Sequence, residues 1–184
     1  MDGARLWECQ PYYGKTLAEI CRGFERVYVS MYKTIGGLGG AVIAGPTAFV
    51  TELRMWRRRH GGDVVHLHPY VASAAMRFDK ALARIPTWVA RTQRLAATLR
   101  KDSRLVVAPD PVPTNMFRVH LRGSADALTE RRDRVAKERG IWVTWGFSPS
   151  RVPGFAECEF QLVEASDSLG DEEAASAVMA VLSA

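Results

Sequence analysis

The sequence predicts an α/β fold for residues 1–62, two connecting helices for residues 63–97, and a small α+β domain for residues 98–184. In the first part, two short strand-like segments flank a glycine-rich run and a helical segment follows. In the last part, strand-like segments alternate with helices that have clear start signals. Apolar residues make up 47% of the chain and charged residues 24%, so we expect a folded core.

The first part contains a short helix and two strands. Residues 15–23 place Leu17 and Ile20 on one helical face, which favours a helix. Residues 27–31 alternate and are β-branched, so we expect a strand there. The glycines of residues 36–40 exclude regular structure. Residues 41–44 are apolar and predict a second, buried strand.

Three helices are predicted next. Thr47 is the expected N-cap of a helix that runs to Arg59 and ends at Gly61-Gly62. Pro86 separates two further helices, which are predicted at Pro69–Arg84 and Thr87–Leu99.

The last part reads as strands and two helices. Ser124 is a good N-cap for a helix that ends at Gly140. Acidic residues from Asp171 onward suit the N-terminus of a final helix, because the helix dipole favours negative charge there. Strands are predicted at Arg104–Ala108, Met116–Leu121, Ile141–Trp145 and Phe155–Glu164.

Net charge and cysteine content restrict the classes of protein to which this chain can belong. The net charge of +5 indicates a generally basic surface, and an anionic ligand or nucleic acid is the alternative. The three cysteines form no CxxC pair, which argues against a zinc site or a disulfide framework and favours a reducing, cytoplasmic setting. We see no signal peptide and no apolar run of membrane-spanning length. We therefore expect no membrane partner.

Three residues of the first part carry candidate chemistry. Lys33 follows a strand and precedes the glycine run. Such a lysine is usually solvated, but a partly desolvated one can form a Schiff base with an aldehyde. Asp2 has two interpretations. Aspartate is common in turns and helix caps, and a carboxylate can also keep a pyridine nitrogen protonated. Arg5 is either a surface residue or a bidentate ligand of a carboxylate.

These residues stand in a recognisable series of motifs. Asp2-Gly3-Ala4-Arg5-Leu6, then Tyr28-Val29-Ser30 with Tyr32-Lys33, then the glycine run through Pro46 closely resemble the threonine aldolase and β-eliminating lyase family. That family comprises pyridoxal-phosphate enzymes of the aspartate aminotransferase fold, also called fold type I. The resemblance implies that residues 1–62 are part of the cofactor-binding large domain. Weaker matches follow at Trp56–Gly62, Pro69–Ala75, Pro113–Phe117 and Val152–Phe155.

The resemblance implies a role for each candidate residue. Lys33 would bind the aldehyde of pyridoxal phosphate, Asp2 would face the pyridine nitrogen, and Arg5 would bind the substrate carboxylate. Arg58 belongs to the basic run Arg54–Arg59 and would contact the cofactor phosphate. A solvated helix face, a subunit contact and nucleic-acid binding are the other readings of that run. Nucleic acid is disfavoured because no recognition motif is present.

The implied activity is cleavage of the Cα–Cβ bond of a β-hydroxy-α-amino acid to glycine and an aldehyde. β-Elimination and transamination are alternatives on the same scaffold, and the resemblance suggests a homo-oligomer. Two departures stand out. Thr34 replaces the glycine that much of the family has after the lysine. Better-studied members also carry a carboxylate-binding arginine in the small domain, and this sequence has no clear match for it, Arg151 being the nearest candidate.

The family's phosphate-binding loop, ring-stacking residue and base for the β-hydroxyl precede its aspartate, in what we call the front half. Met1 directly precedes Asp2 here. We therefore expect either a truncated chain that is inactive alone or a partner chain that supplies the front half. A non-catalytic fragment is the rival interpretation. The histidines are not expected to bind metal, because no fourth ligand accompanies His60, His66 and His68.

Overall fold

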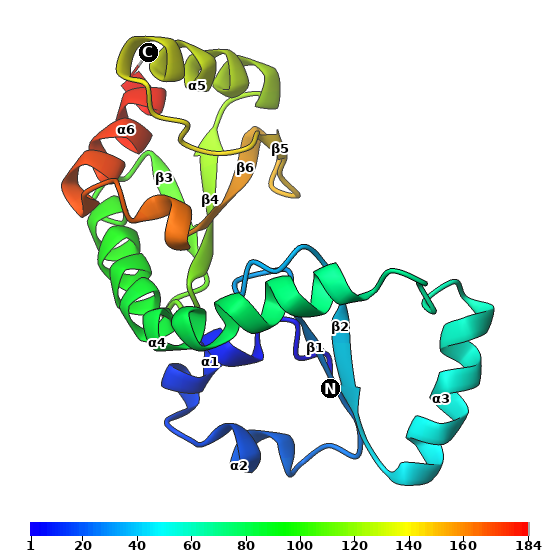
Figure 1. The fold of residues 1–184 in the computed structure, drawn as a ribbon. Helices are drawn as coiled ribbons and strands as arrows, with labels where there is room; N and C mark the ends of the chain where they lie inside the picture. Colours follow the sequence, from blue (N-terminus) through cyan, green and yellow to red (C-terminus); the bar gives the residue numbers. More distant parts are fainter. Residues whose placement is uncertain (184) are drawn as a thin grey trace. The chain divides into compact units, whose positions relative to one another are not determined.

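The computed structural model describes residues 1–183, which form two compact units divided between Pro86 and Thr87 (Figure 1). The first unit contains α1 (Leu6–Tyr13), α2 (Leu17–Cys21), β1 (Val27–Ser30), β2 (Ala41–Ala44), α3 (Thr47–Arg59) and the first part of α4 (His68–Leu99). The second unit contains the rest of α4, then β3 (Leu105–Ala108), β4 (Met116–Arg122), α5 (Ala125–Arg139), β5 (Ser148–Pro149), β6 (Phe155–Gln161), the 3₁₀ turn η1 (Glu164–Ser166) and α6 (Asp171–Ser183).

A two-stranded antiparallel sheet forms the centre of the first unit. Val29 on β1 pairs with Val42 on β2, and Asp2 forms an isolated parallel bridge to Tyr28. The prediction of a strand at residues 41–44 is confirmed, but the prediction that it is buried is wrong. All four residues of β2 are exposed, because β1 is its only neighbour among the described strands.

The helices of the first unit follow their local signals with two exceptions. The α3 helix spans the predicted residues, but Pro46 occupies its N-cap position and Thr47 is its first helical residue, so the predicted cap is wrong. The α1 helix was not predicted, because Pro11 lies inside it and obscured the helical pattern. Gly14, in the left-handed conformation at its C-cap, was the available signal.

The prediction of two helices separated by Pro86 is wrong. One helix, α4, continues through this proline. A proline inside a helix loses a backbone hydrogen bond, which normally ends the helix. Here Ile85, Trp88 and Val89 are buried on both sides of it. Burial of these side chains outweighs the local preference.

The second unit is an antiparallel sheet of order β3-β4-β6-β5 with helices packed on it. Alternate residues of the central strands are buried, and Phe117 lies opposite Phe160 in the register of β4 and β6. The cluster of buried apolar side chains extends from this face to α5 and α6, through Leu128, Val135, Val178 and Val181.

The predicted strand at Ile141–Trp145 is absent, although its residues are apolar and β-branched. The Arg132 side chain on α5 donates hydrogen bonds to the carbonyl oxygens of Thr144, at 3.2 Å, and Trp145. Its guanidinium also lies 4.2 Å from the centre of the Trp142 ring. These backbone acceptors therefore bond to a helix side chain instead of a neighbouring strand.

The remaining boundaries agree closely with the prediction. Ser124 caps α5 by accepting a hydrogen bond from the Ala127 nitrogen at 3.2 Å, and Gly140 ends it in the left-handed conformation. Asp171 begins α6 as expected. β6 is shorter than predicted, since it ends at Gln161 and the chain turns into η1.

Candidate active site

The segment that carries Asp2 runs beside β1. The Gly3 nitrogen donates to the Tyr28 carbonyl at 2.7 Å, and the Tyr28 nitrogen donates to the Met1 carbonyl at 3.0 Å. Asp2 itself is exposed, and its Oδ1 accepts a hydrogen bond from the Ala4 nitrogen at 3.0 Å. Burial, followed by Tyr32 and then the negative charge of Asp2, raises the pKa of the Tyr28 hydroxyl. Asp2 thus lies in the same neighbourhood as Tyr28 and Tyr32.

Arg5 stands at the N-cap of α1, close to the same strand. The Ser30 hydroxyl on β1 donates to the Ala4 carbonyl at 3.0 Å, which fixes the backbone just before Arg5. Nη1 of Arg5 is buried and has no hydrogen-bond partner among the described residues. A buried donor without a partner carries a desolvation cost, which an anionic group would remove. The site therefore fits a ligand with a carboxylate or phosphate near Arg5.

Lys33 lies on a tight turn directly after β1. The Gly36 nitrogen donates to the Lys33 carbonyl at 2.9 Å, and the Gly37 nitrogen donates to the Met31 carbonyl at 2.9 Å. The Lys33 side chain is exposed, whereas the next two residues, Thr34 and Ile35, are buried. Thr34 and Ile35 therefore anchor the turn in the protein, and the Lys33 amine stays accessible to solvent.

The glycines of this turn meet the first part of α4. A Cβ on Gly37 would lie 2.6 Å from the Met31 carbonyl oxygen and 3.3 Å from Ala74. Gly36 has φ of +76°, which other residues rarely adopt. Arg77 donates to the Ile35 carbonyl at 3.3 Å, so α4 holds the turn as well. Close backbone approach therefore explains why the lysine is followed by glycines.

Glu8 is a fourth charged residue of this region that sequence reasoning missed. It lies on the first turn of α1, its side chain is completely buried, and neither carboxylate oxygen has a hydrogen-bond partner within bonding distance among the described residues. Burial raises the pKa of Glu8, although Thr34 and the positive charges of Arg5 and Lys33 act to lower it. The only sequence signal is its spacing of three residues from Arg5.

Arg58 is not brought to the other candidates. It lies on the last turn of α3, its side chain is 84% exposed, and its Nε lies 3.7 Å from Oδ2 of Asp63. Arg57 pairs with the same aspartate at 2.9 Å, and Arg59 lies over the Trp56 ring. In the described chain this basic run is an exposed helix face.

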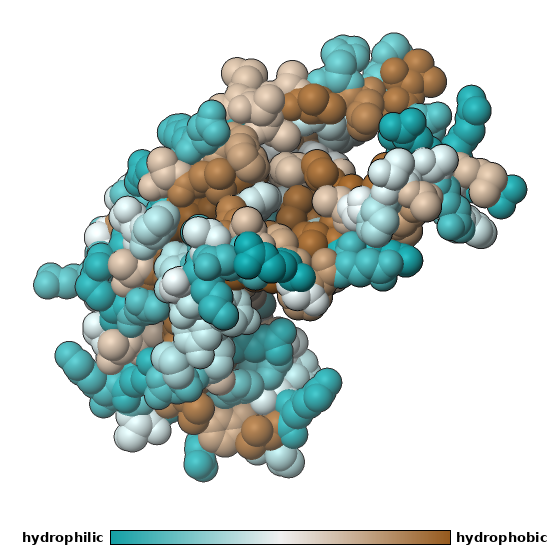
Figure 2. Space-filling view, turned by 90° about the horizontal axis from the view of Figure 1, so that it is seen from below, coloured by the Kyte–Doolittle hydropathy of each residue, from teal (hydrophilic) through white to brown (hydrophobic). Residues whose placement is uncertain are grey.

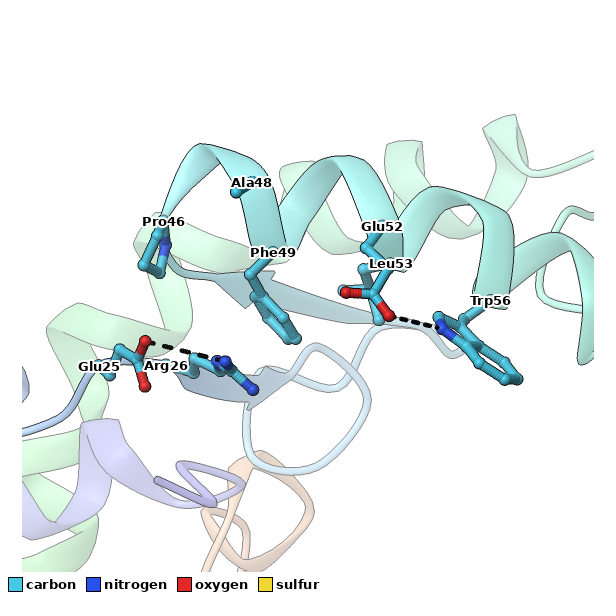
Figure 3. A pocket seen from close by; sticks show the side chains of 8 residues that line it. All are labelled: Glu25, Arg26, Pro46, Ala48, Phe49, Glu52, Leu53 and Trp56. Carbon is cyan, nitrogen blue, oxygen red and sulfur yellow. Dashed lines mark hydrogen bonds and ion pairs between the residues drawn. The ribbon is translucent and has the colours of Figure 1, made fainter.

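A separate pocket lies beside the beginning of β1, whereas Lys33 follows its end (Figure 3). Its volume is about 400 Å³. The Arg26 guanidinium lies 4.2 Å from the centre of the Phe49 ring, and Trp56 donates to Glu52 at 3.1 Å. The pocket contains none of the candidate residues and is lined by Glu25, Arg26, Pro46, Ala48, Phe49, Glu52, Leu53 and Trp56.

Within residues 1–183, no group of three histidine, cysteine or acidic side chains is placed to hold a metal ion. None of the described helices is both long and apolar enough to cross a membrane.

The structure brings together the predicted acid, arginine and lysine around one strand. Asp2 lies beside Tyr28, the backbone before Arg5 is bonded to Ser30, and Lys33 follows the strand by three residues. A carboxylate, an unpartnered guanidinium nitrogen and an accessible amine are the kinds of group that an anionic molecule with an aldehyde and a basic ring nitrogen requires.

Comparison with known proteins agrees with the family resemblance of the sequence motifs. A family model described as beta-eliminating lyase matches residues 1–122. A probable low-specificity L-threonine aldolase 2 from Arabidopsis thaliana is 27% identical over 143 residues, which are 78% of this chain and 40% of the relative.

Two solved structures share the fold over nearly the whole chain. One is a putative aromatic amino acid beta-eliminating lyase/threonine aldolase from Exiguobacterium, with a TM-score of 0.87 and 31% identity over 99% of this chain and 51% of its own. The other is a putative L-allo-threonine aldolase from Listeria monocytogenes, with a TM-score of 0.87 and 33% identity over 99% of this chain and 49% of its own. The chain spans about half the length of these two proteins.

Proposed function

This chain belongs to the beta-eliminating lyase family, and on that premise we propose that it is the cofactor-anchoring part of a threonine-aldolase-like enzyme. The proposed substrate is a β-hydroxy-α-amino acid, which the complete enzyme cleaves to glycine and an aldehyde. The observation that carries the proposal is the convergence of Asp2, Arg5 and Lys33 on β1, with a buried Arg5 nitrogen that lacks a partner.

The family and its structural neighbours are pyridoxal-phosphate enzymes of fold type I. This cofactor supplies an electron-accepting ring that stabilises negative charge on the α-carbon of an amino acid. Lys33 would hold it through the exposed amine, and Asp2 would keep a proton on its ring nitrogen. Arg5 would orient the substrate carboxylate with its planar pair of nitrogens. Arg58 is exposed on α3 and does not lie with these residues, so its proposed contact with the cofactor phosphate is one made from a neighbouring copy in the proposed homo-oligomer.

The front half is proposed as the partner that completes the site. Val42 and Ile43 on β2 are 50% and 40% exposed, and a two-stranded sheet alone is marginally stable in water. Apolar surface, drawn in brown, is also open at several places in Figure 2. The relatives are about twice as long as the matched region. We propose that the front half adds strands to this sheet and that the chain is inactive without it.

Cofactor binding tests the role of Lys33. We expect the chain, alone or with a front half, to gain the visible absorbance of lysine-bound pyridoxal phosphate, and Lys33→Ala to abolish it. Lys15→Ala is the matched control, because Lys15 lies outside the candidate site, just before α2. Equal absorbance in the Lys33→Ala variant would refute the assignment.

The front-half proposal has its own test. The front half of the Listeria monocytogenes relative, expressed as a separate polypeptide, should form a complex with this chain in analytical ultracentrifugation. Val42→Asp should weaken that complex, since it places a charge on the exposed face of β2. Val106→Asp is the control, because Val106 is a 55% exposed strand residue of the other unit. Lack of any complex would contradict the proposal, as would equal loss in both variants.

β-Elimination is the second candidate activity, and the description of the matching family model favours it. Both reactions use the same anchoring residues, so product analysis separates them. Incubation of the completed enzyme with threonine should give glycine and acetaldehyde. Release of ammonia and a keto acid would instead identify elimination. The free state of all three cysteines supports the proposal of a reducing, cytoplasmic setting, and a homo-oligomer is proposed from the family.

A further inference from the structure

The first part of α4 lies beside the loop that joins β1 to β2, and this loop carries Lys33 (Figure 1). Four residues of α4 meet the loop between residues 35 and 39, and their spacing of three, four and seven residues places them on one helix face. They are Tyr70, Ser73, Ala74 and Arg77. One face of a single helix therefore follows the loop along its glycine run.

Two hydrogen bonds join this helix face to the loop, one at each end of residues 35–38. Ser73 Oγ accepts a hydrogen bond from the Leu38 nitrogen at 3.2 Å, and Arg77 Nε donates to the Ile35 carbonyl at 3.3 Å. Ser73 and Arg77 are about one helical turn apart, so a regular element fixes the separation of the two ends. A backbone donor and a backbone acceptor of the loop are thus both satisfied by α4.

Between these two bonds the loop is bonded to the backbone of Lys33. The Gly36 nitrogen donates to the Lys33 carbonyl and the Gly37 nitrogen donates to the Met31 carbonyl, at 2.9 Å each. The loop also packs closely on the helix, because a Cβ on Gly36 would lie 2.9 Å from Nε of Arg77. A continuous series of contacts therefore leads from α4 to the backbone that carries the lysine.

We propose that Ser73 and Arg77 are positioning residues for Lys33: they hold both ends of residues 35–38 and so fix the turn from which the lysine projects. This inference deepens the proposed function and rests on the role proposed there for Lys33. The Lys33 side chain is long and exposed, so its position depends on the backbone that carries it. Small displacements of a reacting group cost large factors in rate, which gives a fixed turn its value.

Hydrogen exchange of backbone amides, measured by NMR on the cofactor-free chain, tests the proposal. Ser73→Ala removes the acceptor of the Leu38 nitrogen, and α4 should stay intact because alanine is the better helix former. We expect the Leu38, Gly36 and Gly37 amides to exchange about five- to tenfold faster, since loss of this bond loosens the whole turn. Met76→Ala is the control, because Met76 is an 84% exposed residue of the same helix.

Faster exchange at Leu38 alone would overturn the proposal, because the effect would then not reach Gly36, whose nitrogen is bonded to the Lys33 carbonyl. Unchanged exchange at all three amides would overturn it as well. Ser73→Thr keeps the hydroxyl and should restore slow exchange, and failure to restore it would overturn the role assigned to the hydroxyl.

Arg77→Met is a second variant, which removes the donor to Ile35 but keeps most of the length of the side chain. We expect the Gly36 amide to exchange faster in this variant to a similar degree. Unchanged exchange there would overturn the role assigned to Arg77.

Capture of pyridoxal phosphate supplies a readout on the lysine itself. The aldehyde is incubated with the chain, trapped by borohydride reduction and located by mass spectrometry. We expect the ratio of modification at Lys33 to that at Lys15 to fall by at least about threefold in Ser73→Ala and in Arg77→Met. An unchanged ratio would overturn the proposal. Absence of capture at Lys33 in the unchanged protein would instead refute the proposed function, and the exchange rates would still decide whether α4 fixes the turn.

Discussion

The backbone nitrogen of Gly3 lies 2.7 Å from the carbonyl oxygen of Tyr28, and a Cβ on Gly3 would lie 2.5 Å from that oxygen. The segment with Asp2 and Arg5 therefore packs directly on β1 because its central residue has no side chain. The same strand leads to Lys33. This close backbone contact therefore fixes the segment with Asp2 and Arg5 beside the strand that leads to Lys33.

Gly3→Ala is expected to separate the N-terminal segment from β1. The added methyl group cannot fit within 2.5 Å of a carbonyl oxygen, so the backbone must shift. We expect a loss of about 1–3 kcal/mol in the unfolding free energy of the first unit, which is typical of overpacking. Urea unfolding followed by amide NMR signals of β1 measures it. Gly23→Ala is the control, because a Cβ there would meet nothing within 4 Å, and equal effects of both changes would contradict the prediction.

The sequence predicts elements well where the signals are local. The α5 helix lies between Ser124, which caps it with its hydroxyl, and Gly140, which ends it in a left-handed conformation. Such signals act within a few residues and can be read directly. The segment at residues 141–145 could not be predicted, because its backbone acceptors bond to Arg132, whose position depends on tertiary structure.

The same distinction applies to the candidate site. Asp2, Arg5 and Lys33 stand in short runs with recognisable composition, and the structure brings them around β1. Glu8 could not be recognised, because a glutamate on a short helix is ordinarily exposed. Its burial depends on how α1 packs with the turn at Thr34, which no local pattern encodes.

Cys158 is expected to resist thiol reagents in the native protein. Burial, together with the negative charge of Glu157, raises the pKa of its thiol to about 12, although Thr144 acts to lower it. The ordinary value is 9.0, so its thiolate fraction should be about a thousandfold smaller than that of an unperturbed cysteine. Labelling with iodoacetamide at about pH 8, resolved by mass spectrometry, should modify Cys21 first. Labelling of Cys158 at the rate of Cys21 would contradict this, and unfolding in urea should equalise the two.

Asp171 is expected to stabilise the second unit. It accepts hydrogen bonds from Arg91 at 2.7 Å and from Arg94 at 2.8 Å. Burial acts to raise the pKa of Asp171, but these two arginines outweigh it and hold the pKa below the ordinary 3.8. The contribution of Asp171 to the unfolding free energy is therefore complete above about pH 3.8, and it is lost as the pH falls through the folded-state pKa.

Replacement of Asp171 by asparagine should lower the unfolding free energy at neutral pH by about 1–3 kcal/mol, because charge-assisted hydrogen bonds are lost. Chemical unfolding followed by amide signals of α6 measures the effect. Asp126→Asn is the matched control, since Asp126 lies in the first turn of α5 and has no ion pair in the described chain. A loss of similar size in the control would show that the helix dipole, not the arginines, accounts for it.

Glu8 should make the first unit less stable as pH rises. Burial raises its pKa above the ordinary 4.5, so the folded state holds a proton that the unfolded state has released. Because the folded state then binds more protons, the unfolding free energy falls with increasing pH from about 4.5 up to the folded-state pKa and is constant above it. Glu8→Gln should remove this slope and be at least as stable as the unchanged protein at neutral pH, since no buried charge forms. Urea unfolding of the first unit across this pH range measures both slopes. A slope that persists in Glu8→Gln would assign the pH dependence to another group.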